Sequence, residues 1–406
     1  MNKEGWQTST LGEVCQIKPP KSEARDRLAA DALVSFLPME DMGIDKKFVR
    51  ATQTKPLSAV AGSYTYFADR DVLLAKITPC FENGKLGIAE GLTNGIGFGS
   101  SEYIVFRPDE TLSREWLYYY LSREVFRVEG AARMSGAVGH KRVAKEFIES
   151  YPIPVPSVSE QQRIVGILDE AFNGLATVKA NAEKNLQNAR ALFESQLQFV
   201  FTLSAPGWVE TTLVDVCQQI TDGKHGDCKD EAGSGFYFLS AKDVKGGTLS
   251  YEKARQITSE DFNETHRRTN LEPGDILITN SGTIGRMAIA PLDDKTSRTT
   301  FQKSVAILKP VRTAIDSRFC FYCLSSGLTR FVNLSAGAAQ KNLLLRDLRS
   351  YRFALPKSLD KQRIVANKFE GLSKETQRLE STYQRKLAAL DELKKSLLHQ
   401  AFTGNL

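Results

Sequence analysis

Two short segments combine side chains that suit DNA with glycines that let a backbone approach a ligand closely. The first follows the strand-like run DVLLAKI and the second follows GDILIT. Lysine and backbone N–H groups suit phosphates, whereas arginine suits guanine and asparagine suits adenine. We therefore predict DNA contacts from Lys76, Thr78, Asn83 and Lys85, and from Asn280, Ser281, Thr283 and Arg286. A structural turn is an equally good interpretation of any single residue among them.

A second pair of segments, ARMSGAVGHKR at 132–142 and NLSAGAAQKN at 333–342, precedes two long helix-like patterns. Their candidate DNA contacts are Arg133, Ser135, His140, Lys141 and Arg142, and Gln340, Lys341 and Asn342. Gln340 could read adenine and Lys341 could meet a phosphate. A helix-start turn with solvated charges is nearly as good an interpretation. His225 in ITDGKHG either contacts DNA or pins its own loop through a side-chain hydrogen bond, and we favour the second.

Motifs that would make the chain an enzyme or a metalloprotein are missing or incomplete. The base-binding N-P-P-[FYW] of amino-methyltransferases is absent, as are G-x-x-x-x-G-K-[ST] and H-E-x-x-H. PLDDK at 291–295 is only a fragment of a nuclease motif. Cys320 and Cys323 form one C-x-x-C, but they lie in an aromatic helix-like run and are better interpreted as core residues than as zinc ligands. We expect no catalysis, metal or cofactor in this chain.

The composition is that of a folded protein with a modest positive charge. The 406 residues are 41% hydrophobic and 25% charged, and the net charge is +6. This length suggests about two to three domains, and the composition excludes disordered and fibrous classes. No run reaches the ~18 apolar residues of a membrane span, the start is too polar for a secretory signal, and six cysteines make no disulfide scaffold. A cytoplasmic location fits best, and the charge permits a nucleic-acid partner without requiring one.

The chain repeats itself at a nearly constant interval. Trp6 matches Trp208 and FLPMED matches FLSAKD, in both cases 202 positions later. YPIPVPSVSEQQRIV matches YRFALPKSLDKQRIV 200 positions later. Chance similarity would not keep one offset at several separated places, so we infer two tandem halves, about 1–203 and 204–406.

Each half is expected to contain an α/β globular domain followed by a long helix. Short β-branched and aromatic runs bounded by turn residues predict an irregular, mostly antiparallel sheet. REWLYYYLS and RFCFYCLSS predict short helices between the strands. The predicted boundaries are 1–157 and 204–357 for the two globular domains, and 158–203 and 358–406 for the two helices.

Both predicted long helices carry apolar residues at the three- and four-residue spacing of a coiled-coil seam. Ser159, with Gln162 three positions later, predicts a capping box at the first helix. The seams comprise Ile164, Leu168, Ala171, Leu175, Val178, Ala182, Leu186, Ala189 and Phe193, and Val365, Phe369, Leu372, Thr376, Leu379, Tyr383, Leu387, Leu390, Leu393 and Leu397. Because each stripe needs a partner, we predict that the helices pack as an antiparallel coiled coil, with the halves related by a pseudo-twofold axis. Two independent helical linkers are the alternative.

Two globular domains, each closed by a motif such as PSVSEQQRIV or PKSLDKQRIV, resemble the DNA specificity subunit of Type I restriction–modification systems. The resemblance covers essentially the whole chain. ITPCFENGK is similar to an element of one class of target recognition domain in that family, and ITDGKHG with GDILITNSGTIGR is similar to another. Where the first closing motif has Glu160-Gln161-Gln162, the second has Asp360-Lys361-Gln362, so only the second glutamine of this triplet is shared at the 200-residue offset.

The resemblance implies a non-catalytic subunit that recognises a bipartite, asymmetric site on double-stranded DNA. It implies that the long helices dock two methyltransferase subunits, and that restriction subunits join through these. S-adenosylmethionine and ATP would belong to the partners. The alternatives are a coiled-coil scaffold that joins partners without reading DNA and, disfavoured by the missing motifs, a divergent nuclease or methyltransferase.

Overall fold

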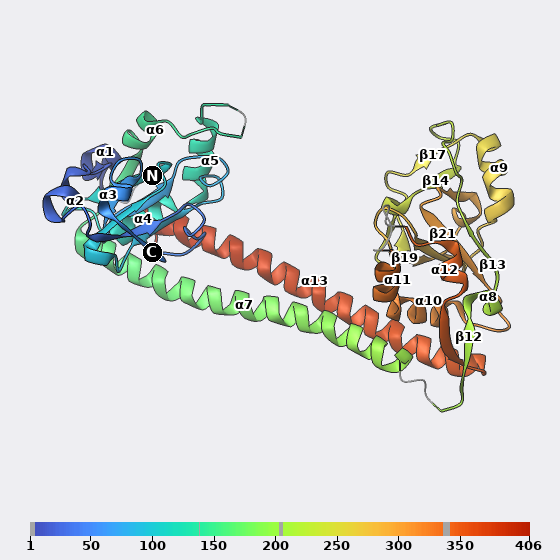
Figure 1. Ribbon diagram of the computed structural model, residues 1–406. Helices are drawn as coiled ribbons and strands as arrows, with labels where there is room; N and C mark the ends of the chain where they lie inside the picture. Colours follow the sequence, from blue (N-terminus) through green and yellow to red (C-terminus); the bar gives the residue numbers. More distant parts are fainter. Residues whose placement is uncertain (1–4, 138, 203–205, 336–341) are drawn as a thin grey trace. The chain divides into compact units, whose positions relative to one another are not determined.

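The computed structural model describes residues 5–137, 139–202, 206–335 and 342–406 (Figure 1). The chain forms two compact units. Unit 1 comprises Met1–Glu183 together with Arg385–Leu406, and unit 2 comprises Lys184–Gln384. Each unit therefore combines one globular part with pieces of both long helices, so the compact units are not the contiguous halves of the sequence. No helix in the described ranges has the length and apolar character needed to cross a membrane.

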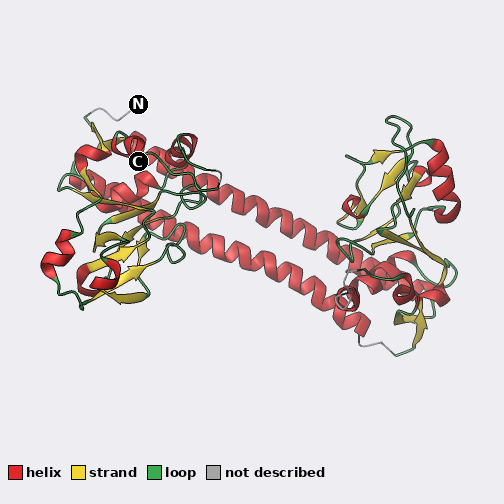
Figure 2. Ribbon diagram, turned by 45° about the horizontal axis from the view of Figure 1, so that its top comes forward, coloured by secondary structure: helices red, strands yellow, loops and turns green. Residues whose placement is uncertain are grey.

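Unit 1 is built on small sheets formed by the β-branched and aromatic runs of the sequence (Figure 2). The first sheet has the order β2 (Cys15–Ile17), β10 (Tyr103–Pro108), β7 (Val72–Ala75), β8 (Leu86–Ala89) and β4 (Phe48–Val49). The second has the order β5 (Gln53–Pro56), β3 (Leu33–Leu37), β9 (Ile96–Gly99) and β6 (Thr65–Ala68), and β1 (Gln7–Thr10) pairs with β11 (Pro152–Val155). Only β3–β9 and β4–β8 are parallel among the pairs of the described residues in this unit.

Unit 2 repeats this plan with smaller sheets. Its main sheet has the order β13 (Cys217–Asp222), β21 (Val305–Pro310), β18 (Ile276–Thr279) and β19 (Met287–Ile289). The others are β17 (Arg255–Gln256), β14 (Tyr237–Leu239) and β20 (Thr299–Phe301), then β12 (Trp208–Thr212) with β22 (Arg352–Pro356), and β15 (Val244–Lys245) with β16 (Thr248–Leu249). The predicted runs DVLLAKI, EYIVFRP, GDILIT and SVAILKP are the inner strands β7, β10, β18 and β21, which confirms the mixed α/β class and the mostly antiparallel sheets.

Short helices cover the sheets of both units. In unit 1 they are α1 (Leu11–Val14), α2 (Ser22–Arg27), α3 (Leu57–Val60), η1 (Thr93–Gly95), α4 (Arg114–Leu121), α5 (Glu124–Ala132) and α6 (Lys145–Glu149). In unit 2 they are α8 (Leu213–Val216), η2 (Ala241–Asp243), α9 (Ser259–Thr269), η3 (Thr296–Arg298), α10 (Ser317–Ser326), α11 (Leu328–Ser335) and α12 (Leu345–Arg349). The two helices predicted from REWLYYYLS and RFCFYCLSS are α4 and α10, and both begin at an N-cap, Ser113 and Asp316, that accepts backbone N–H groups.

The two long helices, α7 (Val158–Thr202) and α13 (Leu359–Thr403), contain 45 residues each. Within unit 1, Lys179 forms an ion pair with Asp391 at 3.0 Å, and Arg163 donates to the backbone carbonyl of Leu406. Because a higher residue number in α7 contacts a lower residue number in the C-terminal segment, the two segments run in opposite directions in unit 1. Within unit 2, Arg190 pairs with Glu380 at 2.6 Å and Phe201 stacks on Phe369, so these segments also run in opposite directions.

Burial along α7 and α13 follows the predicted seam, with one exception. Every seam position of α7 is at least partly buried, and the positions between them are mostly exposed. On α13 the same holds up to Leu390, but Leu393 is 47% exposed and the covered positions continue at Lys394, Leu397 and Leu398. The prediction for Leu393 was wrong because a helix of 3.6 residues per turn drifts away from a strict seven-residue repeat.

The start of each long helix differs from the sequence prediction. Ser157, rather than Ser159, accepts the backbone N–H of Glu160 at the start of α7. Ser358 has the same role at the start of α13, where it accepts from Lys361. The two helix starts are therefore 201 positions apart, because the second copy has one extra residue between its last proline and its capping serine.

This one-residue difference decides which glutamines are equivalent. Gln161 is fully buried and its carboxamide accepts from the Ser113 N–H at 2.8 Å and donates to two backbone carbonyls. Gln362, also fully buried, accepts from the Asp316 N–H at 2.8 Å and donates to two carbonyls at the matching places. Gln162, which the sequence comparison pairs with Gln362, is exposed. The buried glutamines tie each long helix to the loop before α4 or α10.

Each core contains an aromatic residue from the long helix of the other half of the sequence. In unit 1, Phe402 of α13 is 3% exposed and its ring lies 4.5 Å from that of Trp116. In unit 2, Phe201 of α7 lies 5.4 Å from Phe319, and Trp208 packs on the same ring at 5.6 Å. Burial of one aromatic side chain stabilises a fold by about 1.5–3 kcal/mol. Each globular part therefore depends on a helix contributed by the other half.

Candidate nucleic-acid interface

The two predicted loop segments of unit 1 lie against each other. Ile77 and Arg142 form an antiparallel bridge, and the Thr78 N–H donates to the Lys141 carbonyl at 3.0 Å. The Lys141 N–H donates in return to Thr78 Oγ1 at 3.1 Å. Ser135 and Arg142 exchange two further backbone hydrogen bonds, which close the loop between them. The segment after β7 and the segment before α6, more than 50 positions apart, thus form one surface.

The predicted contact residues of unit 1 differ in how free their side chains are. Asn83, His140 and Lys141 are exposed. Lys85 Nζ donates to the carbonyl of Met39 at 2.7 Å and so supports a neighbouring loop. Arg133 donates to the carbonyl of Glu129 and lies 5.2 Å over the ring of Phe147.

A carboxylate that the sequence analysis did not single out lies in the middle of this surface. Glu102 accepts hydrogen bonds from Arg142 Nε at 3.0 Å and Nη2 at 2.8 Å, and Lys76 Nζ lies 4.0 Å away. The hydrogen bond from Arg142, followed by the charge of Lys76, holds the pKa of the Glu102 carboxyl below its usual range. The Glu102 side chain is 20% exposed and that of Arg142 is 46% exposed, so the pair lies at the surface.

Unit 2 brings the corresponding segments together. Ser281 and Asn342 form an antiparallel bridge, and the Leu343 N–H donates to the Asn280 carbonyl at 2.8 Å. Thr279 closes the loop between β18 and β19: its hydroxyl accepts from the Arg286 N–H at 2.9 Å and donates to the Thr283 carbonyl.

The side chains on this loop vary in exposure. Thr283 and Arg286 are exposed, and Ser281 and Asn342 are partly exposed. Asn280 is only 7% exposed, and its buried Oδ1 has no hydrogen-bond partner among the described residues. Gln340 and Lys341 lie outside the described residues.

The same backbone hydrogen bonds define three equivalent positions in the two units. The Lys76 N–H donates to the Glu102 carbonyl, and the Asn280 N–H donates to the Ser304 carbonyl. The third position of each set is the bridge residue already described, Arg142 or Asn342. The three positions therefore carry lysine, glutamate and arginine in unit 1, and asparagine, serine and asparagine in unit 2. Sequence reasoning missed Glu102 and Ser304, although Glu102 is the first residue of the run EYIVFRP and Ser304 is the first residue of the matching run SVAILKP.

The His225 side chain makes the hydrogen bond that we favoured. Its Nε2 lies 3.1 Å from Asp222 Oδ2 in the same loop, and the imidazole is 64% exposed. The loop also pairs with the segment just before Ser304, because the Lys224 N–H donates to the Phe301 carbonyl and the Lys303 N–H donates to the Lys224 carbonyl. Lys224 itself is paired with Asp261 at 2.7 Å and with Glu264 at 3.0 Å. This lysine orders its loop and is already neutralised.

The four cysteines predicted to be core residues, Cys15, Cys217, Cys320 and Cys323, are buried. Cys320 and Cys323 are buried in α10, and burial raises the pKa of both thiols. Burial also raises the pKa of Cys15 and of its repeat partner Cys217 to about 12. Such thiols stay protonated at neutral pH and are poor nucleophiles and metal ligands. Among the described residues, no group of three or more His, Cys, Asp and Glu side chains is placed to hold a metal ion.

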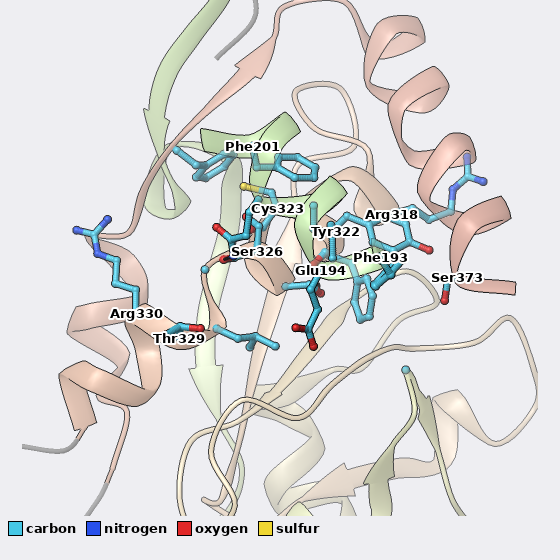
Figure 3. A pocket seen from close by; sticks show the side chains of 18 of the residues that line it. Phe193, Glu194, Phe201, Arg318, Tyr322, Cys323, Ser326, Thr329, Arg330 and Ser373 are labelled. Carbon is cyan, nitrogen blue, oxygen red and sulfur yellow. Dashed lines mark hydrogen bonds between the residues drawn. The ribbon is translucent and has the colours of Figure 1, made fainter. Parts of the chain in front are cut away.

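Unit 2 also contains a groove of about 1530 Å³ beside its helices, which the sequence did not predict (Figure 3). Phe193 and Phe201 of α7 and Tyr322 of α10 supply apolar surface. Glu194 extends among them, and Arg318 and Arg330 lie at opposite sides (Figure 3). The groove lies on the helical side of unit 2, and its lining includes none of the predicted DNA contacts. Its mixed apolar and charged lining suits a protein surface better than a nucleic acid.

Comparison with known proteins finds one family twice in this chain. The family model described as the Type I restriction modification DNA specificity domain matches residues 3–187 and again residues 206–389. These two matches confirm the tandem duplication.

Curated relatives include the Type I restriction enzyme EcoEI specificity subunit of Escherichia coli, 40% identical over 164 residues, which are 40% of this chain and 27% of that protein. The EcoBI specificity subunit of Escherichia coli is 24% identical over 298 residues, 67% of this chain and 62% of that protein. The chain thus spans about a quarter of the length of the EcoEI subunit in the matched region.

Two solved structures share the fold over the whole chain. A chain from a structure of a type I R-M system aligns over 100% of both chains with a TM-score of 0.80 at 19% identity. The HsdS subunit from Thermoanaerobacter tengcongensis aligns over 100% of this chain and 98% of its own, with a TM-score of 0.61 at 18% identity. At these identities the likeness concerns the fold alone.

Proposed function

Because the chain belongs to the Type I restriction modification DNA specificity family, we propose that it is the subunit that selects the DNA sequence in such a complex. Unit 1 reads one half of a bipartite, asymmetric site on double-stranded DNA, and unit 2 reads the other half. One observation carries this proposal: the three positions that the same backbone hydrogen bonds define carry lysine, glutamate and arginine in unit 1 but asparagine, serine and asparagine in unit 2. Equivalent positions with different side chains suit two domains that each bind a different base sequence.

The long helices are proposed to form an antiparallel coiled coil that sets the distance between the two readers. The ion pairs support a pseudo-twofold relation between the halves. Lys179 pairs with Asp391, and Arg190 pairs with Glu380. At the 201-residue offset of the helix starts, Lys179 is equivalent to Glu380 and Asp391 to Arg190, so one contact is the charge-reversed counterpart of the other. A stiff spacer leaves the bases between the two half-sites unread.

The proposed partners of the helices are two methyltransferase subunits, through which restriction subunits join. Apolar side chains that the globular parts leave uncovered support this role: Leu192 and Phe199 of α7 are 60% and 61% exposed, and Ile364 of α13 is 68% exposed. Apolar surface of this kind is typical of protein–protein contacts. In this proposal the chain has no catalytic role, acts in the cytoplasm, and leaves S-adenosylmethionine and ATP to its partners.

Selection from random-sequence duplex DNA tests sequence reading. The full chain, loaded with methyltransferase subunits, should enrich one motif in two parts separated by unselected bases. A motif without unselected bases between its two parts, or the absence of any enriched motif, would contradict the proposal. The absence of a motif would favour the scaffold alternative. A methylation assay on the chain alone should give no transfer, and transfer without a partner would contradict the non-catalytic role.

Co-purification tests the docking surface. Phe199→Asp should lower the amount of methyltransferase that co-purifies with the chain, because a carboxylate would be buried against an apolar partner surface. Leu292→Asp is the matched control, since Leu292 is 91% exposed in the loop after β19 and belongs to neither long helix. Equal co-purification of both variants would show that Phe199 lies outside the contact.

A further inference from the structure

We propose that Glu102 is a specificity-determining residue of unit 1, which positions the Arg142 guanidinium so that its free edge reads guanine in one half-site. Arg142 was among the predicted DNA contacts, whereas Glu102 was not. The inference rests on the proposed function, because it assigns the residue through which unit 1 selects its sequence. Glu102 acts through Arg142 and is therefore a positioning residue.

The hydrogen bonds of Arg142 leave two of its N–H groups without an acceptor among the described residues. A guanidinium has five N–H groups: one on Nε and two on each terminal nitrogen. Nε donates to Glu102 Oε2, Nη2 donates to Glu102 Oε1, and Nη1 donates to the carbonyl of His140 at 3.0 Å. One N–H remains on Nη1 and one on Nη2. We infer that these two N–H groups form the terminal edge of the guanidinium, where they would match a pair of neighbouring acceptors, such as O6 and N7 of guanine or two oxygens of a phosphate.

Both members of the ion pair are fixed by the backbone. Arg142 exchanges two hydrogen bonds with Ser135 and bridges Ile77 on its other side. The Glu102 N–H donates to Ser100 Oγ at 3.2 Å, and its carbonyl accepts from Lys76. The guanidinium is thus held in one orientation before a ligand arrives, which reduces the entropy that binding would otherwise cost.

The charge balance favours a base over a phosphate as the ligand. Glu102 cancels one of the two positive charges of Arg142 and Lys76, so the cluster attracts a phosphate less than two unpaired cations would. A lone arginine is free to follow any phosphate, whereas a neutralised, oriented arginine gains most from the two acceptors of guanine. The carboxylate therefore lowers binding to DNA in general and keeps binding to the matching base.

Unit 2 lacks this device. Its equivalent positions are Ser304 and Asn342, which carry no charge, and Asn342 is the amide that suits adenine. The effect of Glu102 should therefore be confined to the half-site that unit 1 reads. This restriction separates a positioning role from a general effect on charge or folding.

The test compares Glu102→Gln, Arg142→Lys and the double variant with the wild-type chain loaded with methyltransferase. Binding is measured on the selected site, on every single-base variant of it, and on DNA without the site. Glu90→Gln is the matched control, because Glu90 pairs with Arg50 at 3.0 Å elsewhere in unit 1 and its replacement removes the same charge. Thermal unfolding of each variant confirms that the fold is retained.

We expect Arg142→Lys and Glu102→Gln each to lower discrimination at one G·C pair of the unit 1 half-site by about tenfold. The double variant should lose no more than either single variant, because Glu102 acts through Arg142. Glu102→Gln should bind DNA without the site at least as well as the wild type. Glu90→Gln should keep the full discrimination.

Three outcomes would overturn the inference. Unchanged discrimination in Glu102→Gln, together with its loss in Arg142→Lys, would mean that Arg142 needs no positioning. A uniform loss of affinity on all DNA in Arg142→Lys, with a salt slope lowered by about one, would identify a phosphate as the ligand. Additive losses in the double variant would mean that the two residues act separately. Failure of the wild-type chain to select any sequence would instead refute the proposed function.

Discussion

Replacement of Gln161 by alanine should destabilise unit 1 far more than replacement of its neighbour Gln162. The Gln161 carboxamide is fully buried and forms three hydrogen bonds, to the Ser113 N–H and to the carbonyls of Thr111 and Pro156, at 2.7–2.9 Å. Gln162 is exposed on the next position of the same helix. The two substitutions change helix propensity equally, so their difference isolates the buried contacts.

The expected magnitude follows from the groups left behind. Gln161→Ala leaves one buried N–H and two buried carbonyls without this partner, and each such group costs about 1–3 kcal/mol. Water that enters the space recovers part of this cost, so a total of about 3–5 kcal/mol is expected. Gln162→Ala should change the free energy of unfolding by no more than about 0.5 kcal/mol, as for most surface substitutions.

Tryptophan fluorescence can follow unit 1 separately. Trp6 and Trp116 belong to unit 1 and their ring centroids are 5.7 Å apart, whereas Trp208 belongs to unit 2. In a Trp208→Phe background, urea unfolding therefore reports on unit 1. Since two units need not unfold in one step, the unit 1 transition is fitted on its own. Equal midpoints for Gln161→Ala and Gln162→Ala would refute the assigned helix register and the role of the buried carboxamide.

Three further predictions concern unit 2. Asp275→Asn should destabilise it by about 3–5 kcal/mol, because Lys309, whose side chain is 4% exposed and lies 2.6 Å from Asp275, would lose its buried counter-ion. Lys309 would keep only Glu272, which lies 3.9 Å away and whose side chain is 46% exposed. Urea unfolding followed by Trp208 measures this, and Asp360→Asn, at an exposed ion pair, should have almost no effect. Arg286→Ala should relax base choice in the unit 2 half-site by about 1–3 kcal/mol, and an equal loss on every sequence would mark Arg286 as a phosphate or fold residue. Burial, followed by the charge of Lys309, lowers the pKa of His266, so the unfolded chain binds more protons as pH falls below about 6.5. Unit 2 should therefore lose stability between pH 7.5 and 5.5, and His266→Phe should lessen that loss; an unchanged pH dependence would contradict it.

Local patterns were sufficient to predict the elements of each globular part. DVLLAKI and SVAILKP are strands because β-branched and apolar residues suit buried strands, and the turn residues around them end the runs. The helices α4 and α10 were predicted from the runs REWLYYYLS and RFCFYCLSS between the strands, and both have capped starts. The repeat further predicted that matching loops serve matching roles, and the bridges Ile77–Arg142 and Ser281–Asn342 bring the expected segments together in both units.

The sequence comparison failed where one residue changes the face of a helix. Aligning the two closing motifs without a gap pairs Ile164 with Ile364, yet Ile164 is fully buried and Ile364 is 68% exposed. A shift of one position rotates a side chain by about 100° around the helix. Identical letters favoured the ungapped alignment, whereas the buried carboxamides of Gln161 and Gln362 set the register that the fold uses.

The candidate site was incomplete for a related reason. Glu102 and Arg142 are 40 positions apart, and neither position signals the other in one sequence. Lys85 and Lys224 have the residue type of a phosphate contact, but the first supports a neighbouring carbonyl and the second is held by two carboxylates. Residue type gives the chemistry that a side chain can perform, and its neighbours in space decide whether that chemistry remains free.

By itself the sequence determined the duplication, the strands and short helices, the two long amphipathic helices and the family, because these depend on periodicity and on motifs within short stretches. Only the tertiary structure decided which halves of the helices complete which core, as with Phe402 on Trp116 and Phe201 on Phe319. It also decided which glutamine is buried and which carboxylate holds Arg142. These features depend on distances between residues far apart in the chain, and packing fixes such distances through burial and hydrogen bonding that no local pattern records.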